Sequence, residues 1–149
     1  MIMILSMIML TNDNNEESKP VFFLPRITSF EREMAPQLNK RLRIITKIRD
    51  QLKSGIMNAS LQDLKKLTND LVSQLKTIPN YLEQDDNTLM VVKSMPVTSG
   101  ITLKRTAFPK NKFFGKIQKI ETINMQATQQ NQFNQIVSLT DAILGYFIE

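Results

Sequence analysis

The sequence contains no cysteine and no histidine. Without cysteine the chain forms no disulfide, no thiolate metal site and no cysteine nucleophile. Without histidine it lacks the commonest general base, and the two absences together remove both of the commonest zinc ligands. Carboxylates, lysines, hydroxyls and two tyrosines are left to carry any chemistry. The composition therefore predicts a protein that is not an enzyme and that holds no cofactor.

Glycine is also scarce, with four residues that do not cluster. The sequence has no phosphate-cradling G-x-x-x-x-G-K motif and no G-x-S-x-G motif. The closest group of acids, Glu83, Asp85 and Asp86, lacks the spacing and the glycine of an EF-hand loop, which favours a loop turn over a calcium site. We expect no metal site and no small-molecule ligand.

Long hydrophobic runs are missing as well. Residues 1–10, "MIMILSMIML", are almost wholly apolar, but a membrane-spanning helix needs about 20 such residues. No positively charged start or small-residue cleavage site marks a signal peptide. We expect residues 1–19 to form a flexible tail, residues 20–149 to form a single mostly helical domain, and the protein to be intracellular without transmembrane insertion.

Positive charge is present in excess, and it is concentrated in two patches. The chain has 19 Lys and Arg against 14 Asp and Glu, a formal net charge of +5. Residues 104–119 hold six basic residues and no acid, and residues 40–53 hold six basic residues against Asp50 alone. Such patches favour nucleic acid, an anionic membrane or an acidic protein as partner. A solvated face with no partner is the alternative for each.

The first patch contains the stretch "KRTAFPKNKFFGK", residues 104–116, which mixes cations with phenylalanines. Cations neutralise phosphates and exposed aromatic rings stack on unpaired bases, so the stretch has the material of a nucleic-acid site. A second interpretation places the phenylalanines in the core, and a third reads the cluster as a nuclear import signal, which favours the nucleus over the cytoplasm. Phe108, next to Pro109, is the ring expected to be exposed first. The candidate contact residues are Lys104, Arg105, Phe108, Lys110, Lys112 and Lys116.

Helical periodicity dominates the first half of the chain. A helix is predicted over residues 28–54, opened by the T-x-x-E capping box of Thr28 and Glu31 and re-aimed or restarted around Pro36. Its apolar stripe consists of Met34, Leu38, Leu42, Ile45, Ile48, Leu52 and Ile56. Opposite this stripe lies an outward basic row, which either keeps the helix soluble or contacts an anionic partner. The row consists of Lys40, Arg43 and Lys47.

A second helix is predicted over residues 60–78, with Ser60 and Asp63 at its cap and leucines near heptad spacing. Pro79 and Asn80 end it, and the two helices are expected to form a helical hairpin. Residues 86–106 then have β-branched runs and predict a two-stranded ribbon, "TLMVVK" and "GITLKR" joined by "SMPVTS", or an irregular extended excursion. Residues 112–148 predict one long helix, or two helices broken at "QATQQNQ". The fold class is mainly α.

Two apolar segments near the ends of the chain have the character of partner anchors. One is the proline-bounded run that contains Phe22, Phe23 and Leu24, and the other is "ILGYFIE", which contains Tyr146 and Phe147. Each either covers the chain's own core or docks on a partner. The sequence as a whole favours a non-enzymatic helical adaptor or scaffold subunit of a larger protein assembly. The alternatives are direct nucleic-acid binding through the two basic patches, and attachment to an anionic membrane surface through residues 1–10 and the basic patches.

Overall fold

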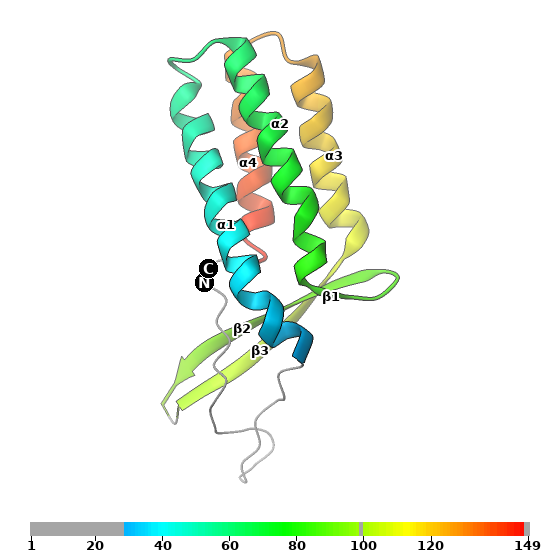
Figure 1. Ribbon diagram of the computed structural model, residues 1–149. Coiled ribbons are helices and arrows are strands. Elements are labelled where there is room, and N and C mark those ends of the chain that lie inside the picture. Colours follow the sequence, from blue (N-terminus) through cyan, green and yellow to red (C-terminus); the bar gives the residue numbers. More distant parts are fainter. Residues whose placement is uncertain (1–28, 99, 148–149) are drawn as a thin grey trace.

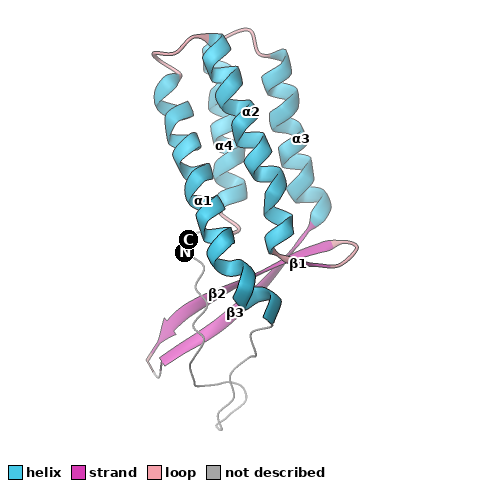
Figure 2. Cartoon of the chain, viewed as in Figure 1, coloured by secondary structure: helices cyan, strands magenta, loops and turns pink. Residues whose placement is uncertain are grey.

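The computed structural model describes the backbone of residues 29–98 and 100–147, and the side chains of residues 34–91, 98, 100 and 105–147. Four helices lie side by side as a bundle, and a small antiparallel sheet crosses one end of it (Figures 1 and 2). The elements are α1 (Ser29–Gly55), α2 (Leu61–Thr77), the 3-10 turn η1 (Ile78–Tyr81), β1 (Glu83–Gln84), β2 (Thr88–Val97), β3 (Gly100–Pro109), α3 (Lys110–Gln126), the 3-10 turn η2 (Gln130–Gln132) and α4 (Phe133–Leu144). The predicted class, mainly α with a short β excursion in the middle, is confirmed.

α1 is one continuous helix through Pro36, so of the two predicted alternatives, re-aimed or restarted, the restart does not occur. Proline inside a helix removes one backbone hydrogen bond. Pro36 lies in the second turn of α1 at an exposed position. The apolar stripe packs as expected, because Leu38, Leu42, Ile45 and Leu52 are all buried in the core.

α2 begins at the cap that the sequence predicts. The Ser60 hydroxyl accepts a hydrogen bond from the backbone N–H of Asp63 at 3.1 Å, which satisfies one of the free donors of the first turn. α2 packs against α1 on one side and α3 on the other, and α4 closes the bundle by packing against α1 and α3. The buried face of α2 contains Leu64, Thr68, Leu71, Val72 and Leu75.

The last third of the chain forms two helices rather than one. The polar stretch around residues 127–132 separates α3 from α4, at the place where "QATQQNQ" interrupts the apolar pattern. Gln129 and Gln132 form a reciprocal capping box there, which gives the backbone donors of the break partners within the loop. Both helices then direct their apolar residues inward, including Phe113 and Ile120 of α3 and Phe133 of α4.

The sheet has the order β1-β2-β3, with both pairs antiparallel. β2 and β3 form a hairpin of ten consecutive register pairs, from Thr88 opposite Pro109 to Val97 opposite Gly100. The predicted ribbon is therefore present, but the connection is shorter than "SMPVTS", since Ser94 to Val97 belong to β2. Gly100 has a φ of 137°, which suits glycine at the end of a tight turn. β1 was not predicted.

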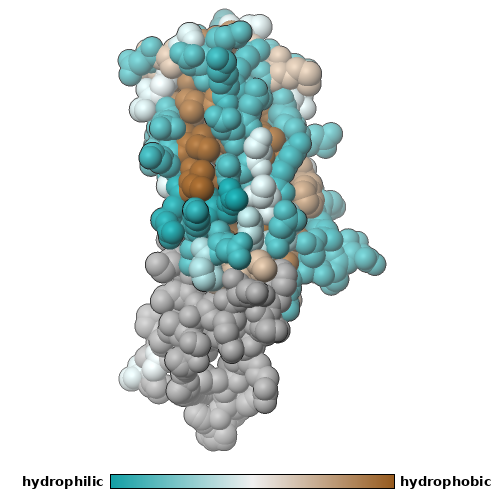
Figure 3. Space-filling view, viewed as in Figure 1, coloured by the Kyte–Doolittle hydropathy of each residue, from teal (hydrophilic) through white to brown (hydrophobic). Residues whose placement is uncertain are grey.

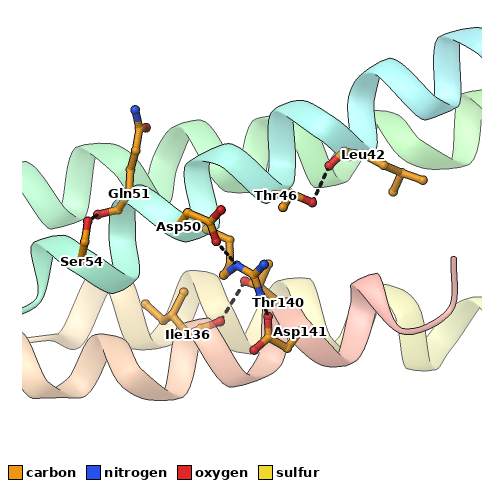
Figure 4. A network of polar contacts seen from close by, with 9 residues as sticks. Leu42, Thr46, Asp50, Gln51, Ser54, Ile136, Thr140 and Asp141 are labelled. Atoms are coloured by element: carbon orange, nitrogen blue, oxygen red, sulfur yellow. Dashed lines mark hydrogen bonds and ion pairs between the residues drawn. The ribbon is translucent and has the colours of Figure 1, made fainter. Parts of the chain in front are cut away.

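Polar contacts connect the helices around the core. Arg41 of α1 donates hydrogen bonds to Gln74 of α2 at 2.9 Å and to the Tyr81 hydroxyl at 3.2 Å. Arg49 of α1 forms ion pairs with its neighbour Asp50 and with Asp141 of α4. Figure 4 shows the carboxylates of Asp50 and Asp141 on the two facing helices, with dashed lines to the guanidinium group between them. These contacts fix the rotation of α1 against α2 and α4.

Candidate interaction surfaces

The basic and aromatic stretch of residues 104–116 divides between core and surface. Phe108 is only 4% exposed, so the prediction that it is the first exposed ring is wrong. In the β2–β3 register it lies opposite Leu89, which is fully buried. Its ring stacks on Tyr146 with centroids 4.2 Å apart and meets Phe147 edge-on at 5.7 Å. Phe108 therefore joins the hairpin to the end of α4, and it is not available to stack on a base in this structure.

Phe113 and Phe114 behave differently from each other. Phe113, in the first turn of α3, is fully buried, whereas its neighbour Phe114 is 42% exposed. Their rings meet at right angles with centroids 5.3 Å apart. The core interpretation of the phenylalanines thus holds for Phe108 and Phe113, while Phe114 remains at the surface.

The basic side chains of residues 104–116 differ in their exposure to solvent. Lys112 is exposed, whereas Arg105, Lys110 and Lys116 are half-buried. Lys116 donates a hydrogen bond from Nζ to the Tyr146 hydroxyl at 3.2 Å and lies 5.5 Å from the centre of that ring. Lys116 thus helps to hold the aromatic contact between α3 and the end of α4. For Lys104 the structure describes the backbone, within β3.

The basic row of α1 lies where the sequence places it. Lys40, Arg43 and Lys47 are all exposed, on the side of α1 opposite its buried stripe. None of the three forms an ion pair with another side chain in the described part of the chain, whereas Arg41 and Arg49 on the same helix bind neighbouring helices. This row is available to an anionic partner, and its binding role stays a prediction.

The two predicted anchors have different outcomes. Phe22, Phe23 and Leu24 lie outside the described residues. At the other end, Phe147 is 1% exposed within the chain's own core and Tyr146 is half-buried against Phe108. The interpretation of Phe147 as an anchor for a partner is therefore corrected, because its ring is already enclosed by its own chain.

The acidic loop between β1 and β2 is a turn, as predicted. One Asp85 carboxylate oxygen accepts hydrogen bonds from the backbone N–H groups of Asn87 at 2.9 Å and Thr88 at 2.8 Å, and from the Thr88 hydroxyl at 2.8 Å. These bonds, the one from the Asn87 backbone foremost, lower the pKa of Asp85 below its ordinary value. The Oδ1 atom of Asp85 therefore holds the turn together.

Beside this turn lies an open hollow of about 710 Å³, with Leu82 and Met90 among its apolar residues and Glu83 and Asp85 among its polar ones. Across the described residues, no group of three or more acidic side chains comes together in a way that would hold a metal ion.

Sequence reasoning missed a surface at the end of the bundle opposite the hairpin. Met57, in the α1–α2 loop, is 87% exposed, and Met125, in the last turn of α3, is 73% exposed. Both segments lie at the same end of the bundle, where the Lys65 ammonium of α2 donates to the Met125 carbonyl at 3.5 Å (Figure 1). We call this surface, defined by Met57 and Met125, the loop end. The one indication in the sequence was that neither methionine occupies a position on the apolar stripe of its helix.

A second apolar feature lies along the side of the bundle. Figure 3 shows a band of apolar residues, bordered by hydrophilic ones, on the face that α1 and α2 present. Half-buried apolar residues on these two helices include Ile44, Ile48 and Leu67. Apolar surface of this kind, next to the cations of α1, is typical of a protein contact rather than of a reactive centre.

No family model, no curated protein and no solved structure matches this chain in comparisons with known proteins. Within the described residues, no helix has both the length and the apolar character needed to cross a membrane.

Proposed function

We propose that the protein is a non-enzymatic helical adaptor subunit that packs into a larger intracellular, nuclear protein assembly. The observation that carries this proposal is the loop end. Met57 and Met125 are exposed at 87% and 73%, whereas the other large apolar side chains that the structure describes, Phe114 excepted, are buried or half-buried. Methionine side chains are flexible and polarizable, and they are used at surfaces that adapt to a partner.

The electrostatics of the bundle support a binding role over a catalytic one. In the described part of the chain, the ion pairs of Arg49 with Asp141 and of Lys76 with Glu121 connect neighbouring helices. The exposed cations Lys40, Arg43 and Lys47 remain on the outer side of α1. A subunit that contacts acidic surfaces of neighbouring subunits would use such a row.

The test is purification of the tagged chain from the cells that naturally express it, at moderate salt, with and without nuclease. We expect companion proteins in fixed ratio that survive nuclease. The variant Met57→Glu/Met125→Glu should lose them, because burying two carboxylates in an apolar contact is costly. The matched control is Ser73→Glu/Gln118→Glu, which adds the same charge at exposed positions on the sides of α2 and α3.

Three results would count against the proposal in different ways. If every companion disappears with nuclease, the adaptor role itself is wrong. If the companions survive nuclease but remain bound to the Met57→Glu/Met125→Glu variant, the role stands and the loop end is the wrong surface. Equal loss in both variants would show that added negative charge, rather than the methionine surface, is responsible.

A further inference from the structure

The side of the bundle formed by α1 and α2 carries apolar side chains that the core does not fully enclose. Ile44 and Ile48 of α1 and Leu67 of α2 are half-buried, and Figure 3 shows an apolar band on this side. The two helices run antiparallel, and the 2.9 Å hydrogen bond from Arg41 to Gln74 aligns them. Counting residues along both helices from that bond places Leu67 level with Ile48. We call the surface of the three apolar residues the α1–α2 face.

Charged side chains of opposite sign border this face on its two sides. On α1, Lys40 and Lys47 lie four residues before and three residues after Ile44, and on α2 the leucine has aspartates at the same spacings, Asp63 and Asp70. Residues at these spacings are neighbours on a helix surface. At about 100° per residue, the lysines lie farther from α2 than Ile44 does, and the aspartates farther from α1 than the leucine does. The face therefore has an apolar centre, a basic border on α1 and an acidic border on α2.

Both borders are free to meet a partner. All four charged side chains are exposed. In the described part of the chain none of the four forms an ion pair with another side chain, whereas Arg49 on α1 and Lys76 on α2 pair with neighbouring helices. Charge that the fold itself does not use, next to half-buried apolar side chains, is typical of a protein contact.

The order of the charges selects the kind of partner. A surface of one sign would be attracted to one border of the face and repelled from the other. A second copy of the chain carries both signs. When two copies face each other about a two-fold axis parallel to the helices, the basic border of each copy lies opposite the acidic border of the other. A two-fold axis that runs across the helices would instead bring like charges together. The face is therefore complementary to itself when the two bundles are parallel.

The alignment of α1 with α2 also singles out one ion pair in such a dimer. It places Lys47 level with Thr68, two residues before Asp70. Two residues correspond to about 3 Å along a helix axis. A two-fold axis parallel to the helices keeps each residue at its own height, so Lys47 of each copy meets Asp70 of the other and the pair occurs twice. Lys40 and Asp63 lie at opposite ends of the face and have no such counterpart.

From these observations we infer that the α1–α2 face is the interface of a symmetric homodimer, formed by its apolar centre and by two Lys47–Asp70 ion pairs between the copies. The interface is separate from the loop end, and the inference stands whether or not the adaptor role is correct.

The test is sedimentation equilibrium of the full chain over a range of concentrations, for the wild type, Lys47→Glu and Asp70→Lys. The wild type should dimerise. The dissociation constant of the dimer should be roughly 10- to 100-fold higher for each variant alone, since both ion pairs of its homodimer become repulsive. An equimolar mixture of the two variants should dimerise within about threefold of the wild type, because every facing pair in the mixed dimer again has opposite signs.

Matched controls make the same charge changes away from the face. Lys53 is exposed one helical turn after Arg49, on the side of α1 that faces α4, and Asp86 is exposed in the β1–β2 turn. Lys53→Glu and Asp86→Lys should each keep the wild-type dissociation constant. The test and control substitutions are all at exposed positions, so circular dichroism should show the same helix content in every variant.

A second measurement needs no variant. Equal amounts of unlabelled and isotope-labelled wild-type chain are mixed and treated with a carbodiimide, which joins a lysine directly to a carboxylate. Mass spectrometry should find a cross-link from Lys47 to Asp70 that connects a labelled peptide to an unlabelled one.

Four outcomes would overturn the inference. A monomeric wild type would leave the α1–α2 face to another occupant, such as the chain's own residues 1–10 or a different protein. A dimer that neither charge reversal weakens would place the interface elsewhere on the molecule. A mixture of the two variants that stays monomeric would contradict the two-fold arrangement, as would a wild-type dimer without the cross-link between copies.

Discussion

Replacing Phe147 with alanine should destabilise the fold rather than release a partner. The ring is 1% exposed and meets Phe108 edge-on at 5.7 Å, so its removal leaves a cavity where the hairpin joins the bundle. Phenylalanine-to-alanine changes in cores cost about 3–5 kcal/mol. With a urea slope near 2 kcal/mol/M, the midpoint of unfolding should fall by roughly 1.5–2.5 M. Urea titration followed by circular dichroism measures this shift.

The control for this prediction is Tyr146→Phe. That change keeps the ring stacked on Phe108 and removes only the hydroxyl that accepts from Lys116. We expect a loss of less than about 1 kcal/mol, because one partly exposed hydrogen bond is removed. A midpoint shift under about 0.5 M for Phe147→Ala, accompanied by loss of bound proteins from the native assembly, would refute the reasoning and restore Phe147 as an anchor.

Three further predictions concern single positions. Asp85 has a lowered pKa, so its stabilisation of the β1–β2 turn is fully present above its ordinary pKa of 3.8 and is lost as pH falls through the lowered value. The variant Asp85→Asn should remove that pH dependence, which amide exchange at Thr88 measures. Asn124 is 7% exposed and its Oδ1 has no hydrogen-bond partner, so Asn124→Leu should leave the melting temperature unchanged or higher even though the Nδ2 bonds to Asn69 and to the Lys65 carbonyl are lost. A fall of several degrees would contradict this. Gly100 has a φ of 137°, so Gly100→Ala should cost the hairpin roughly 1–2 kcal/mol, seen as faster amide exchange in β2 and β3 with little change in the bundle.

The helices were predictable because their information is local. The stripe of Leu38, Leu42, Ile45 and Leu52 and the cap at Ser60 depend on residues within a few turns of one another. Spacing alone therefore places these residues on the buried side and starts α2 at the correct residue.

Phe108 was mispredicted because its burial depends on residues far along the chain. Its sequence neighbours are mostly polar or basic, which suggests a surface, but strand pairing brings it to Leu89 and chain closure brings it to Tyr146. Pro96 misled in a similar way. Proline within a run argues against a strand, yet at a position facing away from the paired strand it is tolerated.

The candidate surfaces were predictable only in part. The basic row of α1 followed from periodicity, because outward positions are set by the same geometry as the buried stripe. The loop end did not, since exposure of Met57 and Met125 depends on how the α1–α2 loop and the end of α3 lie together in the bundle. Phe147 shows the converse case, in which an apolar terminus resembled an anchor and was enclosed by its own core.

Cross-linking mass spectrometry of the assembly purified from native cells tests the adaptor role most directly. Lys53 near the end of α1 and Lys66 near the start of α2 are exposed close to the loop end, whereas Lys112 is exposed at the hairpin end. The account predicts cross-links from Lys53 and Lys66 to other proteins after nuclease treatment. Cross-links confined to this chain, or links to other proteins from Lys112 alone, would contradict it.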